Sequence, residues 1–282
     1  MLQRAAVKIS LKESRKRLAE LFDFLANFGT REIHLIHVPP KISTQQEDIE
    51  EKLEKISKDA GYLGLRVQTH IRCGHVPVIV NEVAEETKAD YTALCWISRS
   101  LFRTAMFGHT ESDILRLSNI PVFIFNPGLF KSANGFEQVM YATDLKDSDA
   151  AVLPYLVDRR FTAKKLYILH VGERAPDPDT DEIRRKRVLD SLHGLARACS
   201  HAYDTVQPVE TIGSVNRQIV KQAAMHGVDL IVVGKSERLD TVSQVVGSTA
   251  ELLPHRAGRS VFIIPVICKL PAQENRQGYH LQ

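Results

Sequence analysis

The sequence predicts an α/β protein made of two doubly wound domains in tandem, and two observations support this. First, the chain repeats once, because Gly74 and Asp90 match Gly213 and Asp229 at a single separation of 139 residues. Second, each repeat alternates short apolar runs with amphipathic stretches, which is the pattern of strands joined by helices. Strands separated by helices pair in parallel through right-handed crossovers, so each repeat predicts a doubly wound sheet.

The first repeat reads as five strands joined by four helices. We expect strands at 5–9, 33–38, 66–71, 91–94 and 122–125, and helices at 14–28, 44–60, 76–87 and 110–117. The second repeat follows the same order from Gln138. Residues 126–135 have the Asn, Pro and Gly content of a linker, and 272–282 resemble a frayed polar tail. We therefore expect domains at 1–128 and 136–268.

Composition limits the class of protein. The chain has 282 residues, 44% of them hydrophobic and 25% charged, which is typical of a globular protein. A formal charge of +3, evenly spread, predicts no nucleic-acid or lipid-surface partner. No run approaches the roughly 18 apolar residues of a membrane span, so we expect a cytoplasmic protein. Four dispersed cysteines without a C-x-x-C pair predict reduced, mostly buried thiols.

One strand-loop-helix stretch of the second repeat carries phosphate-binding chemistry. Leu230–Val233 is an apolar run typical of a buried parallel strand, and we expect a loop to begin at Gly234. Twelve residues later the small and hydroxyl residues 247–249 open a helix, whose free N–H groups can bind an anion. The Gly-Lys-Ser that starts the loop is not the end of a P-loop, because Asp229 stands where that motif needs glycine.

A carboxylate is expected beside this loop. Ligands of doubly wound sheets bind beyond the carboxyl ends of the strands, where the end of the first strand meets the loop after the fourth. In the second repeat these are Asp144 and the loop from Gly234 to Gly247. Asp144 can accept a hydrogen bond from a ribose or a base edge. It can equally cap the helix that follows.

The spacing of the loop resembles that of a known family. Strand, Gly, two residues, Gly, nine residues, Gly-Ser/Thr and helix is the nucleotide loop of the universal stress protein family. Here it reads Gly234, Lys235-Ser236, Glu237, nine residues, then Gly247-Ser248, so only the second glycine is replaced. With the repeat included, the resemblance covers nearly the whole chain and indicates a tandem-domain universal stress protein.

The resemblance implies two five-stranded parallel-sheet domains of Rossmann-like, adenine-nucleotide-binding type, paired through their last strands. It implies that Asp144 contacts base or ribose and that Val171 lines the adenine pocket. The residues implied to hold the phosphates are Gly234, Gly247, Ser248 and Thr249. It leaves ATP and AMP open as ligands of the second domain, with Mg²⁺ as a further candidate.

The first repeat has lost most of this pattern. Ser10 stands at the Asp144 position, Cys95 at the Gly234 position and His109 at the Ser248 position. The loop between Cys95 and His109 is also far more apolar than its counterpart. We expect its bulky side chains to fill the empty pocket or cover a partner surface, and we expect no nucleotide in the first domain.

Glu237 opposes phosphate binding in the second repeat. A glutamate disfavours the left-handed backbone that glycine permits, and it brings a negative charge towards an anion. At ~4–6 Å and an effective dielectric near 20, this contact costs on the order of 3 kcal/mol, or roughly a hundredfold in affinity. Lys235 or Arg238 could offset part of this cost, and a divalent metal could turn the carboxylate into a ligand.

We expect the histidines to have structural roles. His37 and His170 end equivalent interior strands, where a hydrogen-bonded imidazole is expected. His34, His70, Cys73 and His75 supply metal-ligand types, but a closed zinc site needs four convergent ligands and a strand alternates its faces, so we predict no metal. No Ser-His-Asp order or nucleophile elbow is present.

The leading functional hypothesis is a non-catalytic stress-response protein whose second domain binds or senses an adenine nucleotide and reports occupancy to an unidentified protein partner. A nucleotide-independent scaffold and a slow ATP hydrolase remain alternatives. We also expect the two halves to pack as an intramolecular pseudo-dimer through 122–125 and 261–264, because exposed terminal strands need cover. A further homodimer is left open.

Overall fold

The structure is a computed structural model. The residues it describes are 2–40, 46–95, 110–126, 136–146, 148–158, 163–174, 176–236 and 248–266. Within these ranges no helix has both the length and the apolar character needed to cross a membrane. The predicted linker beyond Asn126 and the predicted polar tail lie outside the described residues.

The elements alternate as the repeat predicts. The first half contains β1 (Arg4–Lys8), α1 (Arg15–Asn27), β2 (Glu32–His37), α2 (Gln46–Gly61), β3 (Arg66–Ile71), α3 (Val76–Glu86), β4 (Tyr91–Cys95), α5 (Thr110–Leu117) and β5 (Val122–Phe125). The second half contains β6 (Gln138–Thr143), α6 (Ser148–Leu156), β7 (Lys165–Gly172), α7 (Pro178–Cys199), β8 (Thr205–Ile212), α8 (Val215–Met225), β9 (Leu230–Ser236), α9 (Ser248–Ala257) and β10 (Ser260–Val266).

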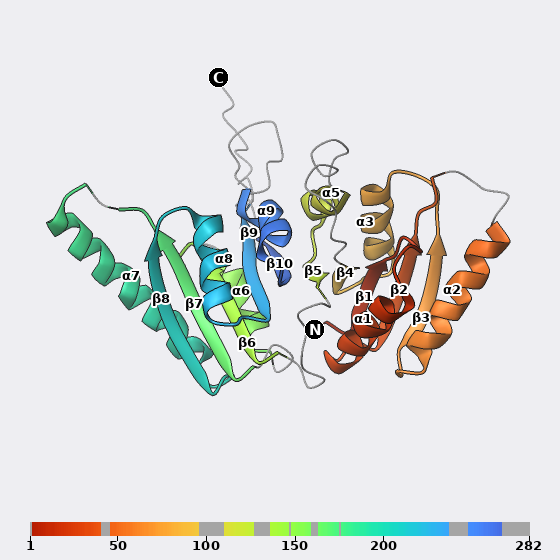
Figure 1. The fold of residues 1–282 in the computed structure, drawn as a ribbon, viewed down its shortest axis with the longest axis horizontal. Coiled ribbons are helices and arrows are strands. Elements are labelled where there is room, and N and C mark those ends of the chain that lie inside the picture. The colour runs from red at the N-terminus through yellow and green to blue at the C-terminus, as the bar shows by residue number, and fades with distance from the viewer. Residues whose placement is uncertain are drawn as a thin grey trace, which may run out of the picture.

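The strands form one ten-stranded sheet in the order β3-β2-β1-β4-β5-β10-β9-β6-β7-β8. Five parallel strands make up each half, and the halves join where β5 and β10 pair antiparallel, with Phe123 opposite Phe262. These two strands lie at the centre of the molecule, while α2 and α7 lie at its outer ends (Figure 1). The predicted contact between the terminal strands of the two halves is therefore confirmed.

One predicted boundary is wrong. The sequence placed the start of a loop at Gly234, but β9 continues through Ser236. The reason is tertiary: β10 extends to Val266 and pairs with β9 over its whole length, from Ser260 opposite Leu230 to Val266 opposite Ser236. A neighbouring strand thus keeps a Gly-Lys-Ser segment extended that has little strand propensity of its own.

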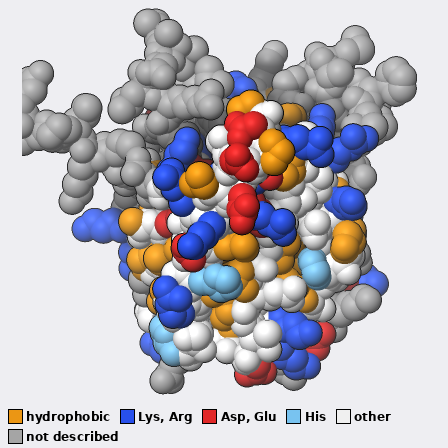
Figure 2. All heavy atoms as spheres, turned by 90° about the vertical axis from the view of Figure 1, so that its left-hand side faces the viewer, with side chains coloured by type: hydrophobic (Ala, Val, Ile, Leu, Met, Phe, Trp, Pro, Cys, Tyr) orange, Lys and Arg blue, Asp and Glu red, His pale blue; other side chains and the backbone are white. Residues whose placement is uncertain are grey.

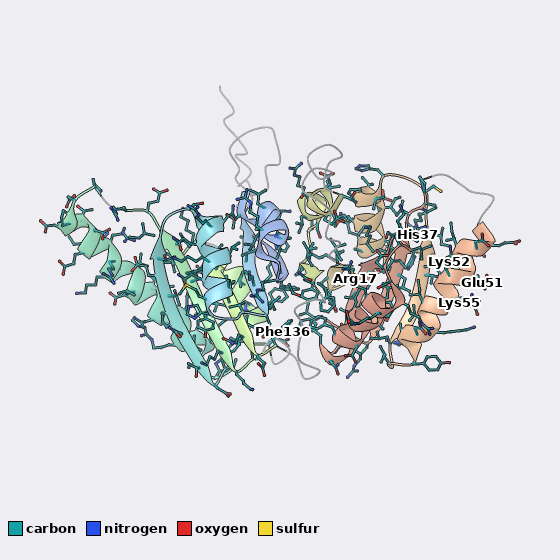
Figure 3. All side chains as sticks on the ribbon, in the orientation of Figure 1. Arg17, His37, Glu51, Lys52, Lys55 and Phe136 are labelled. Atoms are coloured by element: carbon teal, nitrogen blue, oxygen red, sulfur yellow. The ribbon has the colours of Figure 1, made fainter. Side chains whose placement is uncertain are left out.

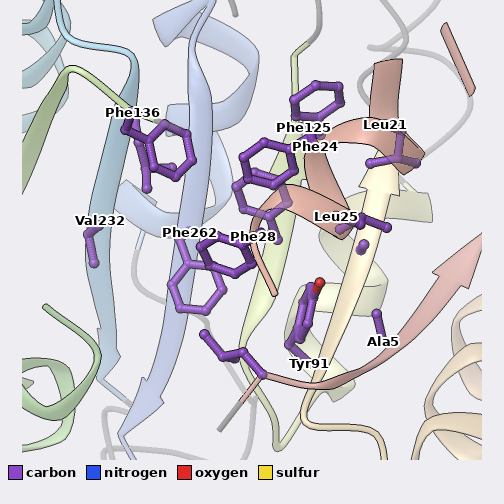
Figure 4. Packing of buried hydrophobic residues seen from close by; sticks show 14 of the residues in the cluster. Ala5, Leu21, Phe24, Leu25, Phe28, Tyr91, Phe125, Phe136, Val232 and Phe262 are labelled. Carbon is purple, nitrogen blue, oxygen red and sulfur yellow. The ribbon is translucent and has the colours of Figure 1, made fainter. Parts of the chain in front are cut away.

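Two helical layers cover the sheet. Buried residues of α1, α2, α6 and α7 share one apolar cluster, and those of α3, α5, α8 and α9 share the other. At the junction of the halves the first cluster is aromatic (Figure 4): the Phe24 ring of α1 stacks on Phe123 and Phe125 of β5 at 4.9 and 5.0 Å. Phe136, which precedes β6, lies 5.3 Å from the same ring. Aromatic packing therefore reinforces the β5–β10 pairing.

A second tie between the halves is a buried lysine. The Lys235 side chain of β9 is 4% exposed, and its Nζ donates to the carbonyls of Leu115 (2.7 Å), Arg116 (3.0 Å) and Ser118 (3.3 Å). These carbonyls belong to the C-terminal end of α5, which normally lacks partners and carries partial negative charge. The lysine of the second half therefore caps a helix of the first.

The two aspartates that mark the repeat hold the first strand of each half. Asp90 Oδ2 accepts from the backbone N–H groups of Gln3 and Arg4 at 2.7 and 3.0 Å. Asp229 Oδ2 accepts from the N–H groups of residues 137 and 138, both at 2.9 Å. The repeated acid therefore satisfies backbone donors where β1 and β6 begin.

Charged groups of both signs are mixed at the α7–β8–α8 end of the molecule. Figure 2 shows Lys and Arg side chains interspersed with Asp, Glu and apolar ones on this face. The exposed apolar side chains of α7 and α8 include Ile183, Val215 and Met225.

Candidate functional site

The structure places Asp144 directly after β6, at the carboxyl edge of the second half of the sheet. The residue is exposed, and its Oδ1 accepts from the Ser148 hydroxyl at 2.6 Å and from the Lys146 N–H at 3.1 Å. Asp144 therefore does tie the start of α6, which is the capping role that the sequence left open. Its Oδ2 makes no hydrogen bond to any other described residue, so one carboxylate oxygen remains available on the exposed side.

Gly234 lies at the same point, on the neighbouring strand β9. A Cβ added to Gly234 would lie 2.5 Å from the Ser148 Cβ, far closer than two carbon atoms can approach. Glycine is therefore required here because α6 starts against β9. The structure confirms that the end of the first strand lies close to Gly234, where the loop was expected to begin, with Ser148 between the two. Residues 237–247 of that predicted loop lie outside the described residues.

A hydrogen-bonded network fixes the turn beneath Asp144. The hydroxyls of Tyr141 and Thr143 both donate to Asp149 Oδ1 at 2.5 Å, and Thr143 accepts from the Leu145 N–H at 2.8 Å. Burial and the contact with Asp149 raise the pKa of Tyr141 far above its usual value, so this phenol stays a donor. Leu145 has φ 57°, and Leu11, its counterpart in the first half, has φ 60°. The strained turn is thus part of both repeats.

The predicted hydrogen-bonded roles of His37 and His170 are confirmed. His170 Nδ1 lies 3.1 Å from the Thr143 carbonyl oxygen, and His37 Nδ1 lies 3.2 Å from that of Ile9. Each imidazole therefore ties the end of one strand to its neighbour. Val171 follows His170 on the opposite face of β7 and is half-buried against the α8–α9 side of the core.

Two amide side chains of α8 supply acceptors that the sequence gave no reason to select. Gln218 Nε2 donates to the Ile212 carbonyl at 2.9 Å, which assigns the orientation of the amide. The buried Gln218 Oε1 and Asn216 Oδ1 have no hydrogen-bond partner among the described residues. Val171 of β7 pairs with Thr211 of β8, and Ile212 is the next residue and ends that strand. Val171 and the buried residues of α8 also belong to the same apolar cluster, so these acceptors lie on the same side of the sheet edge as Val171.

The other face of this edge is closed by an ion pair. Arg184 of α7 lies over Gly172, where an added Cβ would be 2.7 Å from its guanidinium. Arg184 NH1 is 3.0 Å from Glu210 Oε1, and the Glu210 side chain is only 9% exposed. This partly buried pair holds α7 over the strand ends.

Several predicted site residues lie outside the described residues, namely Gly247, Glu237 and the whole 96–109 loop of the first half. The predicted helix start is confirmed, since α9 begins at Ser248. Thr249 lies in its first turn and is half-buried. In the first half, Cys95 ends β4 as a buried residue, and burial raises the pKa of its thiol to about 11.

The candidate metal ligands form a histidine pair. His34 Nδ1 lies 3.1 Å from His70 Nε2, and His34 Nε2 is 3.2 Å from Glu32 Oε1. Burial is the main cause of the lowered pKa of both imidazoles. In the part of the chain that the structure describes, no three His, Cys, Asp or Glu side chains converge as metal ligands.

The fold and the edge site together define a tandem protein of doubly wound α/β domains with a candidate ligand site at the carboxyl edge of its second half. The model of the universal stress protein family matches residues 7–126 and again 135–265. The chain therefore belongs to the universal stress protein family, as two copies of its domain.

Individual relatives agree with this assignment. Universal stress protein G of Salmonella typhimurium is 28% identical over 108 residues, which cover 33% of this chain and 75% of that protein; its counterpart in Escherichia coli O157:H7 is 29% identical over the same shares. Among solved structures, a universal stress protein from Archaeoglobus fulgidus superposes with a TM-score of 0.70 at 19% identity, covering 94% of this chain and 97% of that one. A functionally unknown protein from Pseudomonas aeruginosa PAO1 superposes with a TM-score of 0.70 at 13% identity, covering 94% and 92%.

Proposed function

We propose that the second half binds an adenine nucleotide at the carboxyl edge of β6, β7 and β9, and that the protein acts as a non-catalytic stress-response module. The observation that carries this proposal is the meeting of Asp144, Ser148 and Gly234 at one point. There an exposed carboxylate oxygen stands beside the strand that leads to the N-terminus of α9. A helix N-terminus favours anions, and a carboxylate favours hydroxyl and amine donors, so the two suit opposite ends of a nucleotide.

Each part of the ligand has a proposed partner. Asp144 Oδ2 accepts from the ribose or the base, and Val171 packs on the adenine ring. The phosphates are held by Gly234, Gly247, Ser248 and Thr249. Mg²⁺ would be bound between the phosphates and Glu237, and would offset the repulsion between them.

Gln218 adds base selectivity to this arrangement. Its Oε1 has no hydrogen-bond partner among the described residues and lies on the same side of the sheet edge as Val171. Adenine offers an exocyclic amine donor that hypoxanthine lacks. A site with a buried acceptor rejects a ligand that leaves it unpaired. ATP is therefore preferred over ITP.

We propose that the first half, residues 1–128, binds no nucleotide and that the binding domain is 136–268. In the first half the Asp144 counterpart is Ser10, whose N–H and hydroxyl both donate to the Glu13 carboxylate at 2.8–3.0 Å. The Gly234 counterpart is Cys95, which places a side chain where the second half has none. A cytoplasmic location, where adenine nucleotides are abundant, fits this proposal.

Calorimetric titration with ATP, ADP, AMP and adenosine tests the proposal. We expect one site per chain, weakened at least tenfold in Asp144→Ala and unchanged in Ser10→Ala, the matched variant of the first half. Glu237→Gly should tighten ATP more than adenosine, because only phosphates meet the lost charge. If none of the four ligands binds, with or without Mg²⁺, the nucleotide proposal is wrong and the scaffold alternative takes its place.

Phosphate release separates binding from hydrolysis. A non-catalytic module releases no phosphate from ATP above the level of the Asp144→Ala variant. Release that persists through purification and disappears in Asp144→Ala would favour the slow hydrolase instead.

A further inference from the structure

A groove runs between α1 and α2 on the outer face of the first half. Its volume is about 460 Å³, within the usual range of ~300–1,000 Å³ for small-molecule sites. Leu18, Phe22 and Ile56 give it an apolar surface, and Ala19 lies on its exposed side. The groove belongs to the first half, so it stands apart from the proposed nucleotide site.

Charged side chains form the rim of the groove. Four basic and two acidic side chains line it, and Glu51 and Glu54 beside them bring the acidic groups to four as well. Three of the four cations are matched by a carboxylate: Lys55 with Glu51 at 2.6 Å, Lys58 with Glu54 at 2.7 Å, and Arg15 with Asp59 at 2.7 Å. The fourth, Lys52, is exposed and makes no ion pair with a described residue. Lys52 and Lys55 both project from α2 (Figure 3).

The fold itself does not demand these lysines. At the 139-residue separation of the repeat, buried Leu53 of α2 corresponds to buried Leu192 of α7. The same separation places Ser191 and Gly194 at the Lys52 and Lys55 positions. The second half thus builds its own outer helix, α7, without them, so packing of this helix on the sheet does not require lysine at these positions.

We propose that the α1–α2 groove binds an elongated anionic amphiphile, a long-chain carboxylate. The carboxylate pairs with Lys52, and the alkyl chain lies along Leu18, Phe22 and Ile56. The chemistry follows from the lining: an apolar trough selects an alkyl chain, whose burial is favourable in proportion to its area. Lys52, the one ammonium at the rim without an ion pair to a described residue, selects a negative head over a positive one.

Calorimetric titration of the full chain with dodecanoate tests this, with octanoate as the short-chain ligand and dodecyltrimethylammonium as the ligand of opposite charge. We expect dodecanoate to bind, octanoate at least tenfold more weakly because less chain is buried, and the cation more weakly still. Lys52→Glu should weaken dodecanoate at least tenfold. Ala19→Trp, which fills the groove from an exposed position, should abolish binding.

Lys16→Glu is the matched control, because Lys16 is exposed on α1 and does not line the groove. It makes the same charge change and should leave the affinity within twofold of wild type. Circular dichroism confirms that each variant is folded. The proposal is overturned if dodecanoate does not bind, if Lys52→Glu and Lys16→Glu weaken it equally, or if the cationic amphiphile binds as tightly.

Discussion

Replacing Lys235 tests the contact between the halves most directly. Lys235→Met keeps the length and apolar stem of the side chain but removes the ammonium that donates to three carbonyls at the end of α5. Each buried acceptor left without a donor costs about 1–3 kcal/mol, and a cation at a helix C-terminus contributes up to ~2 kcal/mol. Against this, the variant no longer desolvates a charge, which recovers several kcal/mol. We expect a net loss of about 2–4 kcal/mol.

Urea unfolding followed by circular dichroism measures this loss as a lower midpoint. Lys165→Met is the control, because Lys165 also lies in a strand but its side chain is exposed; a change of under about 0.5 kcal/mol is expected there. The loss in Lys235→Met should be insensitive to salt, since a contact with 4% exposure is screened little. If both variants unfold at the same urea concentration as wild type, Lys235 does not hold the halves together and our account of it is wrong.

Three further predictions rest on single contacts. Gly234→Ala should lower the free energy of unfolding by about 1–3 kcal/mol, because the added Cβ overpacks against Ser148. Thermal melts should show that adding Ser148→Gly recovers part of this stability, whereas adding Ser148→Ala, which keeps the clashing Cβ, recovers none. Lys88 follows α3 with φ 52°, a backbone conformation that a side chain disfavours. Lys88→Gly should therefore stabilise the protein by about 1 kcal/mol in urea titrations, and unchanged stability would contradict this. Burial lowers the pKa of His34 and His70 below 6.5, so the folded state keeps both imidazoles neutral and the stability of the protein should fall as pH drops below about 6.5. His34→Gln should reduce this loss of stability between about pH 7 and 5. An equal dependence of stability on pH in both proteins would refute this.

The fold was predictable because its signals are local or repeated. Apolar periodicity located the helices and strands within a few residues, and the 139-residue repeat predicted that both halves share one topology. The wrong strand boundary at Gly234 arose because the signal there is not local. The sequence there is polar and glycine-rich, and only hydrogen bonds from β10 show that it is a strand.

The contacts of Lys235 and Gly234 could not be predicted from the sequence for the same reason. Lys235 caps carbonyls that precede it by 117–120 residues, and no local pattern reports such a partner. Gly234 matched a nucleotide-loop glycine, yet the contact that requires it is with the first residue of α6. The sequence therefore predicted that Asp144 and Gly234 lie close together, but it did not predict that Ser148 lies between them.

The comparison of the two halves separates residues that both halves share from residues found in one half only. Features present in both halves hold the strand ends: the aspartates at 90 and 229, the histidines at 37 and 170, and the left-handed leucines at 11 and 145. Asp144 and Gly234 are replaced in the first half by Ser10 and Cys95, although the same turn is built around them. The first half builds this turn with Ser10 in place of the carboxylate, whereas Gly234 of the second half is required by its contact with Ser148. The fold therefore accounts for Gly234 and for Oδ1 of Asp144, and the nucleotide that we propose would use Oδ2.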